Sequence, residues 1–527
     1  MTFPRASGIL LHPTSLPGHF GIGDLGNEAR HFADFLSASG QTIWQILPLG
    51  PTGYGDSPYA CYSAFAGNTL LISPELLLKD GLITKSDLAE LPSLPAERVD
   101  FGEVHRTRQR TLKKAFANFQ TNTDTKLQSA FETFAEQNAS WLHDYALFRA
   151  LKHSHDGAAW TQWEPELVRR SAPVLARARA DLHLEIEAQK FYQFIFFRQW
   201  LDLKSYSKRR RIKIIGDIPI FVAHDSADVW TNPEQFKLNP DGTPIVVAGV
   251  PPDYFSKTGQ YWGNPLFNWD HMRADGFKWW IERVRAALQM VDVVRIDHFR
   301  GFAACWEIPG GDTTAEHGRW VEAPGRELFS AIRNAVGELP IIAEDLGVIT
   351  PDVEKLRDDF GFPGMRVLQF AFSSDAKNND LPHNYHHHMA VYTGTHDNDT
   401  TVGWFKGVAG QGSTRMAKEI ERERKFCLQY LKTDGKEIHW DFIRTVFASV
   451  ANTAIVPLQD VLGLGSEARM NLPNSTAGNW LWRFKAEALT DKIGQRLRDL
   501  SQLYGRVLDR DNPEEVATKP VSFSHPK

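Results

Sequence analysis

Short apolar runs rich in β-branched residues recur along the chain, and several of them end in polar residues. Amphipathic stretches such as GFKWWIERVRAALQMV and GRELFSAIRNAVG separate most of these runs and have the period of helices. Strands that alternate with helices are typical of parallel sheets with crossover connections. Eight such units predict an α/β fold, a closed (β/α)8 or TIM barrel. The eight runs cover residues 7–12, 42–49, 212–222, 291–299, 339–347, 365–372, 390–399 and 455–463.

The spacing of these runs is uneven, because residues 50–211 separate the second run from the third. That stretch contains several helical patterns, among them RTLKKAFANF, KLQSAFETFAEQ and WLHDYALFRALK. We therefore expect a single barrel domain over residues 1–527, with an inserted helical subdomain over about 54–205 between its second and third strands.

The composition is that of a globular protein, and its net charge of −5 is small against 59 basic and 64 acidic side chains. Such a balance favours neither nucleic acid nor a membrane surface as a partner. The three cysteines, Cys61, Cys305 and Cys427, form no C-x-x-C pair and indicate a reducing compartment. The chain shows no signal peptide and no apolar stretch of about 18 residues, so we expect a cytoplasmic protein.

A glycine motif near the N-terminus, FGIGDLG at residues 20–26, has the G-x-G-x-x-G spacing of dinucleotide-binding loops. Such a loop needs a strand directly before it, a helix after it and an acidic residue about twenty positions further on. Here PTSLPGHF separates the glycines from the nearest predicted strand, and QTIWQILPLG ends without an acid. We interpret the motif as a glycine-bearing loop ahead of a helix that Asp24 or Asn27 caps.

Three of the predicted strands lead into carboxylates at their C-terminal ends, where the reacting groups of such barrels lie. Asp297 ends VVRID, Glu344 ends PIIAE, and Asp397 lies in YTGTHDND. Since side chains alternate along a strand, Arg295 shares a face with Asp297, and we expect it to keep Asp297 ionised. Each carboxylate alone is also compatible with a helix cap or a simple ion pair. Together they indicate either a divalent-metal site or glycosyl transfer through an oxocarbenium-like transition state.

The histidines of the chain favour glycosyl transfer over the metal site. His298 and His396 show no clear ligand pattern with the carboxylates. The three adjacent histidines at 386–388 lack the i, i+4 spacing that would place two of them on one helix face, and we interpret them as a surface turn. We therefore predict no metal ligands.

The blocks VVRIDHFRG, IIAEDLGVIT and YTGTHDNDT resemble the signature sequences of the 4-α-glucanotransferases, the amylomaltases or disproportionating enzymes of glycoside hydrolase family 77, which are relatives of the α-amylases. The resemblance spans nearly the whole chain in order, through GILLHPTSLPGHFGIGDLG, GDIPIFVAHDSADVW, GVPPDYFSKTGQYWGNPLFNW and NLPNSTAGNWLWR. It implies transfer of α-1,4-glucan segments between maltooligosaccharides, starch or glycogen chains, with glucose as an acceptor and no cofactor. Cyclic glucans are the second class of product that it implies.

The same resemblance assigns the three carboxylates: Asp297 as nucleophile, Glu344 as general acid/base and Asp397 as transition-state stabiliser. In a retaining double displacement the first two carboxyl groups lie about 5 to 5.5 Å apart, and Glu344 needs a raised pKa. The resemblance also implies a loop substructure over about 225–275 above the active-site cleft. The substrate-binding residues that it implies are Arg295, His396, Tyr54, Ser57, Tyr59, Asp253, Gln260 and Trp262.

Some of these assignments have alternatives. Tyr59 and Trp262 are also compatible with core aromatic side chains, and Asp217 in GDIP is expected to be structural. Asn474 in NLPNST stands where many relatives carry glycine, so any substrate contact from that turn is in doubt.

Three other classes of protein compete with the transferase. An amylase-type hydrolase shares the carboxylates and differs in using water as the acceptor. A non-catalytic glucan-binding barrel has no need of three carboxylates beside Arg295. A barrel isomerase or aldolase needs a divalent ion or a Schiff-base lysine at a strand end, and none of the predicted strands ends in lysine.

Overall fold

The computed structural model describes residues 3–53, 55–252, 258–410, 415–473, 475 and 477–507. Tyr54 and Asp253, two of the predicted substrate-binding residues, lie outside the described residues, as does Asn474.

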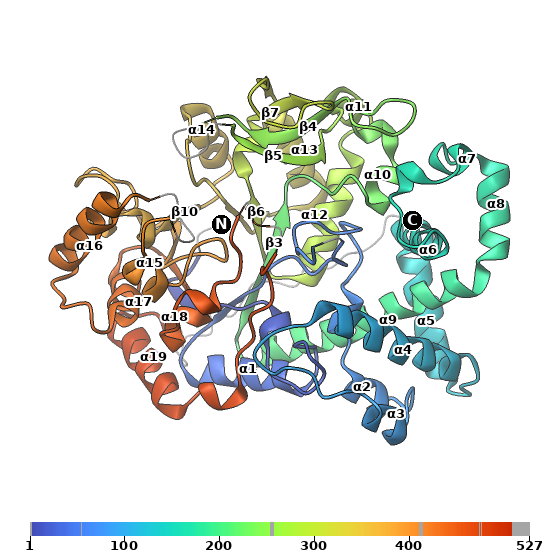
Figure 1. Cartoon of the computed structure of the whole chain (residues 1–527), viewed down its shortest axis with the longest axis horizontal. Helices are drawn as coiled ribbons and strands as arrows, with labels where there is room; N and C mark the ends of the chain where they lie inside the picture. The colour runs from blue at the N-terminus through green and yellow to red at the C-terminus, as the bar shows by residue number, and fades with distance from the viewer. Residues whose placement is uncertain are drawn as a thin grey trace.

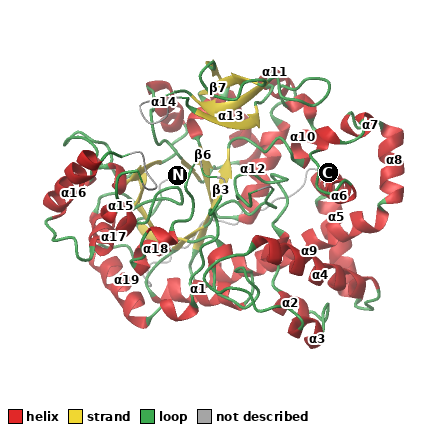
Figure 2. Cartoon of the chain, in the orientation of Figure 1, coloured by secondary structure: helices red, strands yellow, loops and turns green. Residues whose placement is uncertain are grey.

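Eight parallel strands form the central sheet, in the spatial order β10-β11-β12-β1-β2-β3-β6-β9. The two outer strands in this order are β9 and β10. The Ala343 N–H of β9 donates to the carbonyl of Pro363, just before β10, at 2.9 Å, and this hydrogen bond connects the two edges of the sheet. The helices surround these strands (Figure 2), and each strand falls within or overlaps one of the eight predicted runs, so the (β/α)8 barrel is confirmed. The strands are β1 (Ala6–Leu10), β2 (Ile43–Gln45), β3 (Lys213–Pro219), β6 (Val293–Asp297), β9 (Ile341–Ala343), β10 (Gly364–Val367), β11 (Met389–Tyr392) and β12 (Thr453–Pro457).

Helices fill the long stretch between β2 and β3. The longest of them, α9 (His183–Arg209), packs against α12 (Lys278–Met290) of the barrel, where the Trp200 indole N–H donates to the carbonyl of Met290 at 2.9 Å. Figure 1 shows α4 to α9 together on one side of the barrel. The helices of this stretch are α2 (Pro74–Lys79), α3 (Lys85–Ala89), α4 (Phe101–Gln120), α5 (Thr125–Gln137), α6 (Ala139–Ser154), α7 (Pro165–Val168), α8 (Ala172–Asp181) and α9 (His183–Arg209).

The remaining helices mostly follow barrel strands. Their apolar faces close over the outer side of the sheet, as α13 does with buried Leu328, Phe329 and Ile332. These helices are α1 (Asn27–Ala38), α10 (Ala227–Thr231), α11 (Trp269–Ala274), α12 (Lys278–Met290), α13 (Gly325–Val336), α14 (Pro351–Asp359), α15 (Thr401–Lys406), α16 (Ala417–Leu431), α17 (Ile438–Ala448), α18 (Leu458–Leu462) and α19 (Asp491–Leu503).

A second, antiparallel sheet stands beside the barrel (Figure 1) and was not predicted as strands. Its order is β5-β4-β7-β8, from β4 (Val246–Val250), β5 (Gln260–Pro265), β7 (Ala304–Pro309) and β8 (Arg319–Glu322). Val247, Ile308 and Ala315 form a small apolar core on this sheet. The first two strands lie within residues 225–275, and the last two connect this segment to the chain that follows β6.

The glycines of the motif at residues 20–26 allow the backbone of this loop to pack closely against its neighbours. A side chain at Gly23 would place its Cβ 2.0 Å from the carbonyl oxygen of Pro13, and Gly21 has a φ of 76°. The helix α1 begins at Asn27 with Gly26 as its N-cap, and neither predicted cap residue bonds to the first helical turn. Asp24 instead accepts a hydrogen bond from the Gly26 N–H at 2.8 Å.

None of the helices within the described ranges is both long and apolar enough to cross a membrane.

Candidate active site

A buried arginine joins two carboxylates on the inner face of the barrel. The register of β3 against β6 sets Asp217 opposite Arg295. The Arg295 guanidinium donates from Nη1 to Asp217 Oδ2 at 2.6 Å and contacts Asp297 Oδ1 from Nη2 at 2.9 Å. The predicted guanidinium beside Asp297 is therefore present. Asp217, expected to be only structural, turns out to be the second partner that orients this guanidinium.

Tyr59 and His396 also belong to this cluster, Tyr59 through the same carboxylate oxygen of Asp217 and His396 through Tyr59. The Tyr59 hydroxyl donates to Asp217 Oδ2 at 2.7 Å, and its ring stacks on the His396 imidazole with centroids 4.9 Å apart. Burial, followed by the charge of Asp217, raises the pKa of Tyr59 well above its usual range, so the hydroxyl remains a donor. Tyr59 is thus a member of the polar cluster as well as a half-buried aromatic.

Glu344 follows β9 directly and is held by two backbone donors. The His298 N–H donates to its Oε2 at 2.7 Å, and the Leu346 N–H donates to its Oε1 at 2.8 Å. His298 takes a left-handed φ of 52°, a conformation that a residue adopts at a cost and that often marks a functional site. The acid/base candidate is thereby attached to the residue that immediately follows Asp297.

The environment of Glu344 favours its protonated form. Burial first, and the nearby Asp297 carboxylate second, raise the pKa of Glu344 to about 7. Arg295 and the two backbone N–H donors oppose this rise. A carboxyl group with such a pKa can hold a proton near neutral pH and give it up during a reaction.

Asp397 lies in the loop that follows β11, with its side chain exposed. Its Oδ1 lies 3.3 Å from His396 Nε2 and accepts a hydrogen bond from Asn471 Nδ2 at 2.7 Å. Arg469 donates to the main-chain oxygen of Asp397 at 2.7 Å. Sequence reasoning missed Asn471 and Arg469, although Asn471 is the first residue of the NLPNST motif that it had singled out and Arg469 lies two residues before it.

Trp262 and Gln260 approach the same cluster from β5. The Trp262 indole N–H donates to Gln260 Oε1 at 3.1 Å, and its ring lies 4.8 Å from the His298 ring. Trp262 is 38% exposed, so it is not a core aromatic. Ser57 contacts the cluster through Tyr59, because its hydroxyl accepts from the Tyr59 N–H at 3.2 Å.

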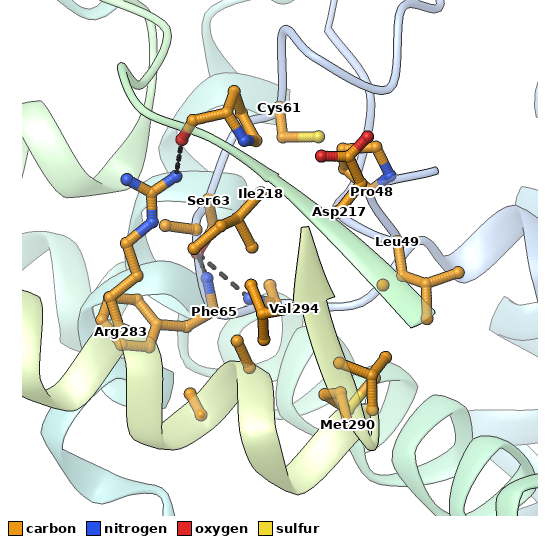
Figure 3. Close-up of a pocket in the computed structure, with 18 of the residues that line it drawn as sticks. Pro48, Leu49, Cys61, Ser63, Phe65, Asp217, Ile218, Arg283, Met290 and Val294 are labelled. Atoms are coloured by element: carbon orange, nitrogen blue, oxygen red, sulfur yellow. Dashed lines mark hydrogen bonds between the residues drawn. The ribbon is translucent and has the colours of Figure 1, made fainter. Parts of the chain in front are cut away.

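A partly open cavity borders this cluster, and Asp217 and Tyr59 are among the residues that line it. It has a volume of about 170 Å³ and is lined by Ile218, Arg283, Met290 and Val294 between β3, β6 and α12 (Figure 3). Asp217 and Ile218 project from opposite faces of β3, because side chains alternate along a strand.

Within the part of the chain that the structure describes, no three histidine, cysteine or acidic side chains are grouped as a metal site would require. Of the histidines at 386–388, His388 lies with its Nε2 2.9 Å from the carbonyl of Gly361.

Comparisons with known proteins agree with this geometry. The family model described as 4-alpha-glucanotransferase, glycoside hydrolase 77, matches residues 11–490. The 4-alpha-glucanotransferase of Synechocystis sp. is 52% identical over 95% of this chain and 98% of its own, and that of Thermus thermophilus is 50% identical over 96% of this chain and 100% of its own. The solved amylomaltase of Streptococcus agalactiae in complex with acarbose has a TM-score of 0.90 and 41% identity, and the match covers 95% of this chain and 100% of that one. The chain belongs to the glycoside hydrolase 77 family of 4-alpha-glucanotransferases.

Proposed function

We propose that this chain transfers α-1,4-glucan segments between maltooligosaccharides, starch or glycogen chains, with glucose as the smallest acceptor. The observation that carries the proposal is a pair of carboxyl groups on adjacent strands with different surroundings. Asp297 contacts the buried Arg295 guanidinium at 2.9 Å, whereas burial raises the pKa of Glu344 to about 7. One ionised and one protonated carboxyl group are what a retaining glycosyl transfer requires.

The first half of the reaction forms a glycosyl ester. A carboxylate oxygen of Asp297 bonds to the anomeric carbon of the donor while the bond from that carbon to the glycosidic oxygen breaks. Glu344 gives its proton to the departing oxygen, so the shortened glucan leaves as a neutral alcohol. Arg295 keeps the Asp297 carboxylate oriented through the contact at its other end with Asp217.

The second half returns the enzyme to its starting state. Glu344, now ionised, takes the proton of an acceptor 4-hydroxyl as that oxygen bonds to the anomeric carbon and the ester bond to Asp297 breaks. Two inversions at one carbon retain the α configuration. Asp397, oriented by Asn471 at 2.7 Å, is proposed to hold hydroxyls of the sugar ring through hydrogen bonds that strengthen in the transition state.

Transfer rather than hydrolysis requires that a bound sugar hydroxyl reaches the ester before water does. The exposed Trp262 ring, next to His298 and therefore near the nucleophile, offers an apolar face on which an acceptor sugar can stack. Residues 225–275 are proposed to cover the cleft with this ring.

Two further proposals concern the whole chain. The helices between β2 and β3 are proposed to form the inserted subdomain. The free Cys61, Cys305 and Cys427 support a proposed cytoplasmic location.

Incubation with pure maltotriose separates this proposal from its rivals. Free glucose and longer maltodextrins are expected to appear while the total of reducing ends stays nearly constant, because each transfer moves a glucan without creating a new end. Both quantities are measured in the same samples over time. A rise of reducing ends in step with glucose would identify a hydrolase, and unchanged maltotriose with retained binding would identify a non-catalytic glucan-binding barrel.

Activity is expected to decline as the pH rises through about 7, where Glu344 loses the proton that the leaving oxygen needs. A raised pKa of an acid means that its active, protonated form predominates below that pKa and disappears above it, so kcat/KM should approach about a tenfold loss per pH unit. The initial rate of glucose release from maltotriose, measured between about pH 5 and 9, provides the profile. A rate that is constant from neutral to alkaline pH would contradict the role of Glu344.

A further inference from the structure

Hydrogen bonds connect the loop after β6 to the loop after β9. Besides the bond from the His298 N–H to Glu344 Oε2, the Phe299 N–H donates to the Glu344 carbonyl at 3.1 Å. The third connection uses a side chain as donor: the Arg300 guanidinium donates from Nη1 to the carbonyl of Val348. The segment that directly follows the nucleophile candidate is therefore joined to the acid/base candidate's segment at three consecutive residues.

The third connection has its own support in the small sheet. The Trp320 ring of β8 lies under the guanidinium of Arg300, with Cζ 4.1 Å from the ring centroid. Trp320 in turn packs edge-on against Trp306 of the neighbouring β7, with centroids 5.4 Å apart. An aromatic face attracts a cation and fixes the plane of a guanidinium, so the β7–β8 pair holds Arg300 in the position from which it reaches Val348.

The loop that Arg300 reaches needs such an anchor. Val348 is 77% exposed, and Gly347 before it has a φ of 85°, so these two residues have little packing of their own, whereas Leu346 is partly buried against the core. Leu346, which donates its N–H to Glu344 Oε1 at 2.8 Å, lies two residues before the anchored carbonyl. Movement of the turn would therefore move one of the two backbone donors that orient the Glu344 carboxyl group.

We propose that Arg300 and Trp320 are positioning residues for the transfer reaction, which fix the turn at 346–348 so that the Leu346 N–H stays on Glu344. The inference rests on the proposed acid/base role of Glu344. Neither residue needs to touch the substrate: Arg300 acts through the Val348 carbonyl, and Trp320 acts through Arg300. The small sheet thereby contributes to the site in two ways. Its β5 strand carries Trp262, and its β8 strand supports the loop of the acid/base candidate.

The expected signature is a shift of the alkaline limb of the pH profile. The charged groups that face Glu344 are Asp297 and Arg295 of β6, and the one that faces Arg300 is Asp352 of α14. The Leu346 hydrogen bond favours the ionised form of Glu344, so its loss raises the pKa and moves the alkaline limb to higher pH. Loss of the Arg300 charge acts in the same direction, so a variant that keeps this charge is needed.

The test compares Arg300→Ala, Arg300→Lys and Trp320→Ala with the exposed neighbour variant Arg319→Ala in maltotriose disproportionation. We expect Arg300→Ala to lower kcat by about 10- to 100-fold with little change in KM, because a displaced catalytic group affects the reacting state more than binding. Arg300→Lys should recover part of this loss, since an ammonium group can also donate to the Val348 carbonyl. Trp320→Ala, which keeps the charge, should lower kcat and move the alkaline limb in the same direction as Arg300→Ala.

Arg319→Ala should keep the wild-type kcat and pH profile, because Arg319 contacts Glu307 and neither catalytic loop. Thermal unfolding of each variant shows whether the fold is intact. A Trp320→Ala protein that is folded and has the wild-type kcat and alkaline limb would overturn the proposal, as would a fall in activity that appears in KM alone. If Glu344→Gln proved fully active, the proposed function itself would fail, and that outcome is independent of the Arg300 series.

Discussion

Replacement of Asp297 by asparagine is expected to lower transfer from maltotriose by at least about 10⁴-fold, the scale of loss when a covalent nucleophile is removed. A neutral amide cannot form the glycosyl ester, so the first half of the reaction has no route. The fold should tolerate the change, because an amide oxygen still accepts from Arg295 and the guanidinium keeps its second partner, Asp217, at 2.6 Å. Binding of maltooligosaccharides should therefore stay measurable by calorimetry.

The matched control is Asp270→Asn, which makes the same chemical change at a carboxylate of α11 that is 96% exposed. Its activity should equal that of the wild type. A second variant, Asp297→Gly, leaves space for azide at the position of the missing carboxylate. An activated α-glucosyl donor should then yield β-glucosyl azide, because a single displacement inverts the anomeric carbon. Substantial maltotriose turnover by Asp297→Asn, or an α-configured azide product from Asp297→Gly, would remove Asp297 from the nucleophile role.

The barrel could be predicted because its strands are buried on both faces. Such strands appear in the sequence as continuous apolar runs, and all eight runs correspond to strands. Their ends could not be predicted as well. The run at 390–399 forms a strand only as far as Tyr392, because the polar residues that follow leave the sheet and build the loop that carries His396 and Asp397.

The small antiparallel sheet escaped prediction for a different reason. Its strand β5 carries exposed aromatic residues together with Gly263 and Pro265, a composition that also fits a loop. Its central pairing, β4 with β7, joins segments that a helix pair and a barrel strand separate along the chain. Local patterns contain no signal for a pairing of this kind.

The candidate site shows the same division between local and non-local information. Arg295 and Asp297 are two residues apart, so strand alternation alone placed them together. The contact of Asp217 with Arg295 depends on the register between β3 and β6, and the contact of Asn471 with Asp397 depends on how two distant loops meet. Neither can be derived from spacing in the sequence, which is why Asp217 was expected to be structural and Asn471 was not considered.

Replacement of Glu344 by glutamine is expected to slow both halves of the reaction, with a loss of about 10² to 10⁴-fold on maltotriose. Glutamine has nearly the same shape, and its single oxygen can accept from only one of the two N–H groups, of His298 and Leu346, that the carboxyl group accepts from. It can neither give a proton to the leaving oxygen nor take one from the acceptor. The alkaline limb of the pH profile should also disappear, because the group with the pKa of about 7 is gone.

The choice of donor and acceptor can separate the two tasks of Glu344. An α-maltosyl fluoride donor needs little help from an acid, because fluoride is a good leaving group, so Glu344→Gln should still form the ester from it. Release to a sugar hydroxyl should stay slow, since no base takes its proton, whereas azide needs no base and should speed turnover and give the α-configured azide. Thermal unfolding and maltotriose binding serve as controls for the fold. A Glu344→Gln protein that loses activity equally with maltotriose and maltosyl fluoride, and that azide does not rescue, would show that Glu344 is not the acid/base of this enzyme.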